Sequence, residues 1–277
     1  MTPHKFSLAH LTILDVPPPE LVRVAAAAGY DYVGLRTIPL HLSGEPVYEL
    51  HADPVLFRET KAALDSTGVR VLDIELARIV DDRQPVEYVP ALEAAVALGA
   101  RHVLSSIWAK DREIVVDRFG QLCDLADSLG LTVNLEFVST TNWSTLAGAR
   151  DVLKAAHRDN AGIMVDTMHF HRARTSLDEL DRLPAQWFNY VHIADDRTDV
   201  PTTLEEARRT MREERLYPGE GAVDIAGILR HLPDNVVCAI ELPHRVRQRE
   251  LGAARFAREC LDRTKRYLSQ DSADGTP

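Results

Sequence analysis

The sequence predicts a single (β/α)8 barrel, also called a TIM barrel, spanning residues 1–268. Apolar strand-like segments alternate with helical segments along the whole chain, and eight such pairs can be placed. The strand segments are continuous apolar runs, as expected for parallel strands that are covered on both faces. The 277 residues contain no break in composition that would mark a linker, and about 250 residues is the usual size of one such barrel.

The elements follow in order from turn residues and from hydrophobic periodicity. Helical segments of the first half end at Gly29, Gly68, Gly99 and Gly130, because glycine readily adopts the left-handed conformation that closes a helix. We expect strands at residues 5–14, 32–35, 69–76, 102–107, 131–138, 162–165, 190–193 and 236–242. We expect helices at residues 20–28, 54–66, 86–98, 113–129, 144–157, 177–182, 204–215, 223–232 and 247–268, a long loop at 39–53, and a disordered tail at 269–277.

A doubly wound open sheet is the alternative architecture for this alternation of elements. Such sheets commonly carry a glycine-rich phosphate-binding turn directly after the first strand. The sequence has three consecutive prolines, residues 17–19, at that point and no such glycine pattern. The barrel is therefore the favoured prediction.

Composition excludes several classes of function. The formal charge of −10 argues against a nucleic-acid-binding protein, which requires a basic face. No apolar run approaches the ~20 residues that span a bilayer, and the N-terminus lacks the pattern of a signal peptide. The three cysteines are widely spaced and give no disulfide or zinc-ribbon pattern. We expect a cytoplasmic protein with a small-molecule substrate, and leave open whether it is a homo-oligomer.

Polar side chains gather where the predicted strands end. Active sites of TIM barrels lie at these carboxyl ends, so such residues are candidates for the site. The candidates in chain order are Arg36, Glu75, Trp108, Glu136, Asp166, His169, His192, Asp195, Glu241 and His244.

The last four strands each contribute a residue able to bind a metal. A lone carboxylate or histidine at a buried strand end is more often structural, because it can be paired or hydrogen-bonded. Four on consecutive strands are harder to dismiss, since each bears its own cost of desolvation. Glu136, Asp166, His192 and Glu241 offer three oxygens and one nitrogen. That donor set predicts one divalent metal ion, Mn²⁺ or Mg²⁺ first, with Co²⁺ or Zn²⁺ as alternatives.

Several short motifs in the second half carry a resemblance to a known family. They are LEF with Glu136, VDTMH with Asp166 and His169, VHIADD with His192 and Asp195, PGEG at 218–221, and IEL with Glu241. Together they resemble the xylose isomerase-like TIM-barrel superfamily. That superfamily includes ketose 3-epimerases, sugar isomerases, inosose dehydratases, 3-dehydroshikimate dehydratases and the endonuclease IV family.

The resemblance implies roles for individual residues. Glu136, Asp166, His192 and Glu241 would bind one metal ion, and the two glutamates would be catalytic, facing a substrate carbon from opposite sides. His169 would contact a substrate oxygen. Arg197 is the nearest counterpart of an arginine that contacts substrate in relatives, although the local spacing differs.

Two features depart from the epimerase pattern and suggest an anionic substrate. Arg36 stands where epimerase relatives often have a glutamate, and an arginine there is suited to a carboxylate or phosphate. The segment 204–221 places Arg209, Arg212 and Arg215 before PGEG, as in 3-dehydroshikimate dehydratases, which bind a carboxylated ring. A rim ion pair for Arg36 and a solvated helix face for the other arginines are the alternative interpretations.

Glu75 and Trp108 are weaker candidates for substrate binding. Glu75 either contacts substrate or lies behind the residues that do. Trp108 either forms an apolar wall for a sugar or ring, or is a packing residue.

We predict a metal-dependent isomerase or epimerase of a keto-sugar or related polyhydroxy ketone. A cation that polarises the carbonyl makes the adjacent proton removable by a carboxylate. Return of the proton to the opposite face gives epimerisation, whereas loss of a β-hydroxyl gives dehydration, so a dehydratase of 3-dehydroshikimate or an inosose is the alternative. An endonuclease IV-like phosphodiesterase is a minor alternative, because that family needs additional metal ligands.

Overall fold

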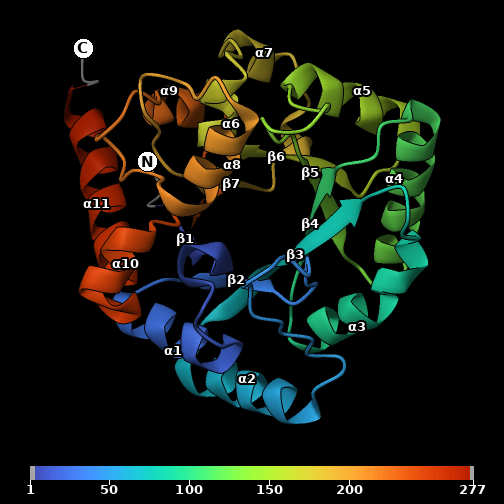
Figure 1. Cartoon of the computed structure of the whole chain (residues 1–277), viewed down its shortest axis with the longest axis horizontal. Coiled ribbons are helices and arrows are strands. Elements are labelled where there is room, and N and C mark those ends of the chain that lie inside the picture. Colours follow the sequence, from blue (N-terminus) through green and yellow to red (C-terminus); the bar gives the residue numbers. More distant parts are fainter. Residues whose placement is uncertain (1–3, 275–277) are drawn as a thin grey trace.

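The computed structural model describes residues 4–274, and the predicted (β/α)8 barrel is confirmed (Figure 1). Eight parallel strands close in sequence order, with β8 pairing to β1. The strands are β1 (Phe6–Leu8), β2 (Tyr32–Arg36), β3 (Arg70–Ile79), β4 (His102–Ile107), β5 (Thr132–Glu136), β6 (Ala161–Asp166), β7 (Tyr190–Ile193) and β8 (Val237–Ile240).

Helices form a ring outside the barrel and bury its outer face (Figure 1). The α-helices are α1 (Pro18–Ala28), α2 (Pro54–Thr67), α3 (Val89–Ala97), α4 (Arg112–Asp127), α5 (Leu146–Ala156), α6 (Thr167–Arg172), α7 (Asp178–Asp181), α8 (Leu204–Glu213), α9 (Ile225–Arg230), α10 (Arg245–Leu251) and α11 (Ala253–Asp274). Three short 3-10 helices are η1 (His10–Ile13), η2 (Pro85–Tyr88) and η3 (Ala185–Trp187).

Helix α1 shows how local sequence and packing agree. Proline occupies its first turn, where a missing N–H has no cost. Gly29 closes it with φ +93°, and its N–H donates to the Ala25 and Ala26 carbonyls. Leu21, Val22 and Ala25 are fully buried against the barrel. Burying each large aliphatic side chain stabilises the fold by about 1.5–3 kcal/mol.

Several predicted elements differ from the structure: the strand expected at residues 69–76 continues to Ile79, and helix α6 was not expected. The first strand ends at Leu8, and residues 10–13 form η1 because the Thr12 N–H donates to the Ala9 carbonyl. The helix expected at 86–98 is divided into η2 and α3. The closing helix is divided at Gly252, which has φ +76°, and α11 then continues to Asp274. Residues 269–274 of the expected tail are thus helical, and residues 275–277 lie outside the described part.

Strand β3 is irregular in a way that matters for the site. Its pairing with β2 shifts register between Val33 and Gly34 of β2. Its pairing with β4 shifts register between Ile74 and Ala77 of β3 itself. Each shift adds one residue to β3. Such bulges re-aim the side chains that follow them.

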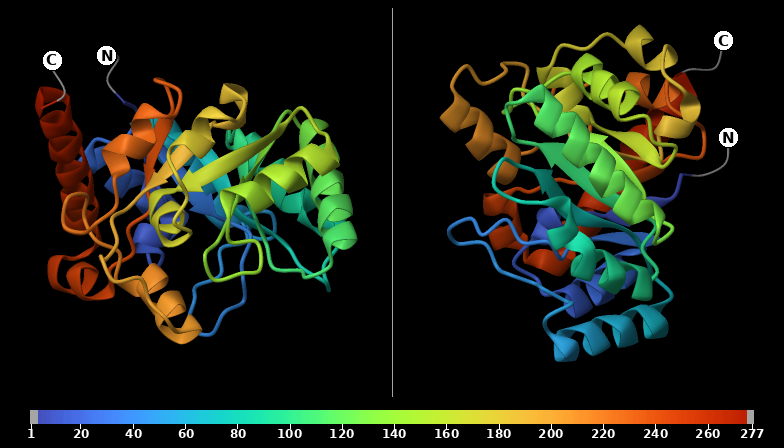
Figure 2. Two further views of the ribbon diagram at one scale, coloured as in Figure 1. Left: turned by 90° about the horizontal axis from the view of Figure 1, so that it is seen from above. Right: turned by 90° about the vertical axis from the view of Figure 1, so that its right-hand side faces the viewer.

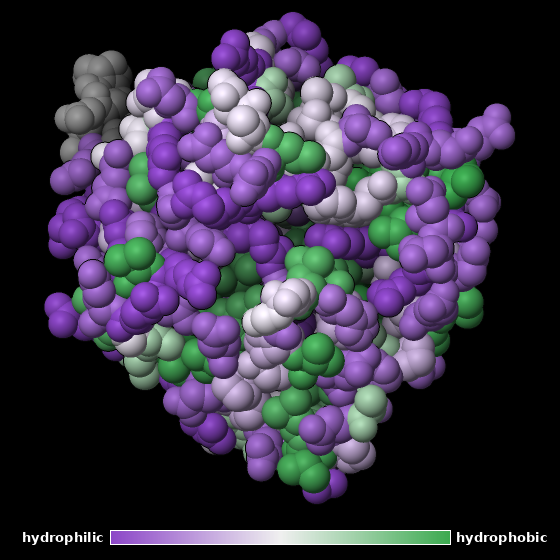
Figure 3. Space-filling view, in the orientation of Figure 1, coloured by the Kyte–Doolittle hydropathy of each residue, from purple (hydrophilic) through white to green (hydrophobic). Residues whose placement is uncertain are grey.

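Helix α8 and the loop between β2 and α2 project from the same end of the barrel (Figure 2). An ion pair between Glu45 of that loop and Arg212 of α8 joins them. The face in Figure 3 is hollowed near its centre, with hydrophilic residues along one side of the hollow and hydrophobic residues along the other. No helix within residues 4–274 has the length and apolar content needed to cross a membrane.

Candidate metal centre

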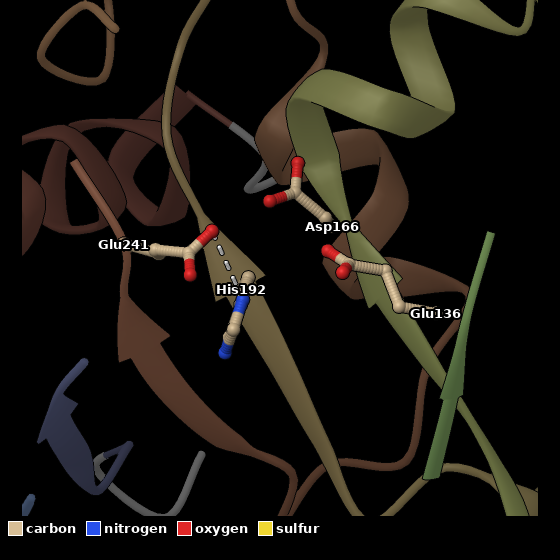
Figure 4. A group of neighbouring side chains, drawn as sticks. All are labelled: Glu136, Asp166, His192 and Glu241. Carbon is tan, nitrogen blue, oxygen red and sulfur yellow. Dashed lines mark ion pairs between the residues drawn. The ribbon is translucent and has the colours of Figure 1, made fainter. Parts of the chain in front are cut away.

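Four side chains from consecutive strands converge at the carboxyl end of the barrel (Figure 4). Glu136 and Asp166 are the last residues of β5 and β6, His192 lies in β7, and Glu241 directly follows β8. One potential ligand atom from each residue lies within 4.8 Å of the others. The structure therefore brings together all four residues that the sequence predicted as ligands.

The four residues are buried, so their charges are poorly solvated. Burial and the neighbouring carboxylates of Glu241 and Asp166 raise the pKa of Glu136 well above its usual value. Burial would lower the pKa of His192, but Glu241, whose Oε2 lies 3.4 Å from His192 Nδ1, helps to raise it to about 10. Without a cation, Glu136 and His192 therefore favour their protonated forms.

Arg215 lies against the cluster and contacts two of its carboxylates. Its Nη1 is 2.5 Å from Asp166 Oδ2, and its Nη2 is 2.7 Å from Glu241 Oε2. Burial alone would raise the pKa of both carboxyls, but the guanidinium keeps the pKa of Asp166 and of Glu241 below the usual range. The Nε and Nη1 groups also donate to the backbone carbonyls of Met211 and Glu241. Arg215, predicted to bind substrate, therefore also orients predicted metal ligands.

Asp166 is held in place from two sides. It caps helix α6, because its Oδ1 accepts the backbone N–H of His169 at 3.0 Å. Its other oxygen accepts from Arg215. The sequence VDTMH encodes this arrangement directly, since an aspartate before a helix commonly accepts an N–H three residues later.

His169 presents one ring nitrogen to the site in a defined protonation state. The backbone N–H of Ser139 donates to its Nδ1 at 3.2 Å, which makes Nδ1 an acceptor. Burial lowers the pKa of His169 to about 4, so the ring is neutral and its proton is on Nε2. Nε2 lies 4.0 Å from Glu136 Oε1. His169 is thus a hydrogen-bond donor beside the predicted catalytic glutamate.

The donor set fits a divalent cation. Three carboxylates face one guanidinium, which leaves two negative charges in excess when His192 is neutral. Nε2 of His192 is buried without a hydrogen-bond partner, and Nδ1 has only the 3.4 Å ion pair with Glu241, an arrangement that is costly unless a ligand is bound. Glutamate and aspartate oxygens with one imidazole suit Mn²⁺, Mg²⁺, Co²⁺ or Zn²⁺. Within residues 4–274, this is the single group of three or more such side chains that could hold a metal ion.

A small cavity opens above the cluster. Its polar wall includes Glu136, His169 and Glu241, and it is further lined by four arginines and Trp108. The arginines are Arg36, Arg78, Arg212 and Arg215. The Trp108 ring lies under the Arg78 guanidinium, with 4.1 Å between Cζ and the ring centroid.

Arg36 and Glu75 form a buried ion pair beside this cavity. The Nε and Nη2 groups of Arg36 both donate to Glu75 Oε2, at 3.1 and 3.0 Å. The Arg36 backbone N–H donates to His10 Nδ1 at 3.0 Å, which fixes the end of β2. Arg36 lines the cavity, whereas Glu75 lies behind it and does not. The pairing expected in the alternative interpretation of Arg36 is present, but it is buried.

The structure does not bring Arg197 to the cavity. Its side chain is 43% exposed and forms ion pairs with Glu206 and Glu214. Asp195, from the same segment, accepts backbone N–H groups of Gly219, Gly221 and Val223, each at 2.9 Å. The segment after β7 therefore turns away from the cluster to anchor the PGEG turn.

Sequence reasoning missed Arg78 and did not single out Arg212 as a site residue. Arg78 follows the bulge in β3, which turns its side chain toward the cavity. Nothing in the local sequence indicates a bulge there. Arg212 lies in the last turn of α8, and Arg215 follows two residues after that helix ends, so no helical repeat links the two.

Comparison with known proteins places the chain in a family. Residues 22–264 match the family model described as xylose isomerase-like TIM barrel, so the chain belongs to this family. It is 29% identical over 244 residues to an inosose isomerase of Bacillus velezensis, which covers 77% of this chain and 79% of the relative. It is 28% identical over 199 residues to an inosose isomerase of Bacillus licheniformis, covering 66% and 68%.

Solved structures share the fold at lower identity. A crystal structure of the IOLI protein with a bound zinc atom superposes with a TM-score of 0.76 at 22% identity, covering 96% of this chain and 98% of the other. The 3-keto-D-glucoside 4-epimerase YcjR of E. coli gives 0.70 at 19% identity, covering 95% and 100%. These likenesses support the architecture.

Proposed function

We propose that the protein is a divalent-metal-dependent isomerase or epimerase of a keto-sugar or a polyhydroxy ketone such as an inosose. The observation that carries the proposal is the pair of glutamates, Glu136 and Glu241, at one four-residue cluster. They extend from β5 and β8, which are three strands apart in a ring of eight. Two carboxylates that approach from different sides suit proton removal on one face of a carbon and return on the other.

The relatives support this class of reaction. Both Bacillus proteins carry the name inosose isomerase, and each is matched over about two thirds or more of its length. An isomerase of a polyhydroxy ketone needs proton abstraction next to a carbonyl, which is the chemistry expected of this donor set. The bound cation would polarise the carbonyl and balance the negative charge that develops on its oxygen.

Residues of the chain carry out the proton transfers, orient the substrate and hold the ligands in position. One glutamate takes the α-proton, and the other returns a proton from the opposite side. The neutral His169 donates from Nε2 to a substrate oxygen and thereby fixes its orientation. Arg215 holds Asp166 and Glu241 in position and limits the repulsion between them. Burial of all these groups excludes water, which strengthens each electrostatic interaction.

Dehydration of a cyclic ketone is the second candidate, and the arginines of the cavity are the observation that favours it. Arg36, Arg78 and Arg212 line the same space as the glutamates, as suits a carboxylated ring. The same proton abstraction then leads to loss of a β-hydroxyl group. A phosphodiesterase with several metal ions is disfavoured, because residues 4–274 offer one ligand cluster.

One experiment tests both candidates. The Mn²⁺-loaded protein is incubated in D₂O with inososes, keto-sugars and 3-dehydroshikimate, and the products are followed by NMR and ultraviolet absorbance. Exchange of the α-proton with formation of an isomer, abolished by a chelator, is the expected result. A new conjugated chromophore would assign the dehydratase instead. Full turnover in both Glu136→Gln and Glu241→Gln would refute the metal-site mechanism altogether.

A further inference from the structure

Arg78 is a cation in the cavity that has no carboxylate partner among the described residues. The other three arginines of the cavity each form an ion pair: Arg36 with Glu75, Arg212 with Glu45, and Arg215 with Asp166 and Glu241. Arg78 instead lies over the Trp108 ring, and its buried Nε has no hydrogen-bond acceptor. A buried donor without an acceptor is costly, so this arginine is poised for a ligand.

Arg36 adds a second unused donor at the same wall. Its Nε and Nη2 are used by Glu75, but Nη1 is buried and has no partner. The Arg36 side chain is 5% exposed, so water does not readily compensate for this loss. Arg212 completes the wall from α8. Burial and, to a smaller extent, the Arg36 charge lower the pKa of both Arg78 and Arg212 to about 10, so both side chains are poorly solvated yet still charged at neutral pH.

The position of Arg78 relative to the metal ligands matches the length of a small substrate. Arg78 pairs in register with Ser106 of β4, and Ser106 pairs with Glu136 of β5. Two strand spacings amount to about 10 Å between the backbones of Arg78 and Glu136. A small substrate with its ketone at the cluster would therefore lie within reach of the long Arg78 side chain.

The charge balance of the cavity favours a ligand group with one negative charge over a group with two. The ion pairs of Arg36 and Arg212 are each neutral, and a divalent cation would neutralise the cluster together with Arg215. Arg78 alone then contributes one uncompensated positive charge. A carboxylate matches that charge, whereas a phosphate monoester, with about two negative charges at neutral pH, exceeds it.

We propose that Arg78, assisted by Arg36 and Arg212, binds a carboxylate at the end of the substrate remote from its ketone. Within the proposed class, the preferred substrate is then a keto acid of sugar or cyclic polyol type. This inference rests on the proposed function for the orientation of the substrate, but the carboxylate site itself does not depend on the metal.

Matched pairs of ligands test the proposal on the full-length protein, with and without Mn²⁺. Each pair differs in one terminal group: D-fructuronate with D-fructose, D-tagaturonate with D-tagatose, and 3-oxocyclohexanecarboxylate with 3-(hydroxymethyl)cyclohexanone. Calorimetry gives the dissociation constants. We expect the acid of at least one pair to bind about 10- to 100-fold more tightly than its neutral counterpart, the effect of a charge-assisted hydrogen bond. The absence of an acid preference in all pairs would overturn the proposal.

The variant Arg78→Met removes the charge and keeps an apolar chain over Trp108. It should abolish the acid preference while leaving the weaker affinity for the neutral member unchanged. Arg70→Met is the matched control, because Arg70 lies at the opposite end of the same strand and also stacks on a ring, that of Tyr32. It should keep the acid preference. Equal loss of affinity for acid and neutral ligands in Arg78→Met would identify a structural residue and overturn the proposal.

Two further outcomes show whether the carboxylate assignment or the proposed function is wrong. Tighter binding of D-fructose 6-phosphate than of D-fructuronate would overturn the assignment of a carboxylate. An acid preference without any metal-dependent proton exchange would support the carboxylate site and refute the proposed function. The preference of the unaltered protein needs no variant, so the proposal stays testable if Arg78→Met does not fold.

Discussion

The two halves of the barrel present their functional side chains in different ways. From β5 to β8 the strands pair in unbroken register, and each carries one residue of the candidate metal cluster at or near its end. In the first half, β3 shifts register against both of its neighbours. The residues that it contributes, Glu75 and Arg78, lie beside or in the cavity without belonging to the cluster.

This difference suggests a division of labour. The regular half positions four ligands that must meet within a few ångströms, and regular strands hold such geometry well. The irregular half lines the part of the cavity where the rest of the substrate would lie. We infer that the second half carries the chemistry and that the first half, together with Arg212 of α8, selects the substrate. The predictions below test this division.

The largest effect is expected from the glutamates of the second half. Glu136→Gln or Glu241→Gln should reduce α-proton exchange by about 10³-fold or more, because each change removes a group that transfers a proton and a charged metal ligand. Exchange into substrate in D₂O, followed by NMR, measures the loss. Glu214→Gln is the matched control, since Glu214 pairs with Arg197 and Arg209 outside the cavity. An equal loss in the control would refute the assignment.

Arg215→Met should destabilise the metal-free protein by about 3 kcal/mol. The change leaves Asp166 and Glu241 buried without their guanidinium partner, and breaking a buried ion pair costs about 3–5 kcal/mol. Urea unfolding gives the free energy of unfolding. Arg209→Met removes a more exposed arginine from the preceding helix and should change stability by less than about 0.5 kcal/mol. Equal stabilities of the two variants would show that the cluster does not depend on Arg215.

Metal affinity should rise with pH by about tenfold per unit for each proton displaced. The neighbouring carboxylates raise the pKa of His192 in the metal-free protein to about 10, from an ordinary value of 6.5. Protonated His192 thus stabilises the metal-free fold fully below pH 6.5, and this contribution is lost as pH rises toward about 10. Metal must displace that proton.

Calorimetry of Mn²⁺ binding in buffers of different ionisation enthalpy measures the protons released. We expect at least part of one proton per metal at pH 7. A metal affinity that does not change between pH 6.5 and pH 8 would contradict the charge balance inferred for the cluster.

The smallest effect is expected from Arg197. Its ion pairs with Glu206 and Glu214 lie at the surface, and such pairs contribute about 0–1 kcal/mol. Arg197→Ala should change the rate of proton exchange by less than about twofold. A loss comparable to that of the glutamate variants would restore the substrate contact that the family resemblance implied.

The fold and the convergence of the four predicted ligands were predictable from the sequence because both depend on local signals. The alternation of apolar runs with glycine-closed helices specifies the barrel, as at Gly29. Parallel strands in sequence order bring their carboxyl ends to one rim, so residues at the ends of neighbouring strands must approach one another. Counting along the sequence was therefore sufficient to find Glu136, Asp166, His192 and Glu241.

The remaining parts of the site were decided by tertiary structure. Counting in twos from Ile74, whose side chain packs in the outer core, would turn Arg78 toward the helices. The extra residue in β3 places Arg78 in the cavity instead. Arg215 and Arg197 are both charged residues after β7, and only the paths of the intervening segments bury one against the cluster and leave the other exposed.

The sequence by itself thus determined which chemistry is available, because the types of the ligand residues and the order of the strand segments along the chain can be read from it directly. Only the tertiary structure decided which charges remain unpaired inside the cavity, because that depends on contacts between segments far apart in the chain. Glu45 with Arg212, and Arg36 with Glu75, are such contacts. They leave Arg78 as the cation available to a substrate.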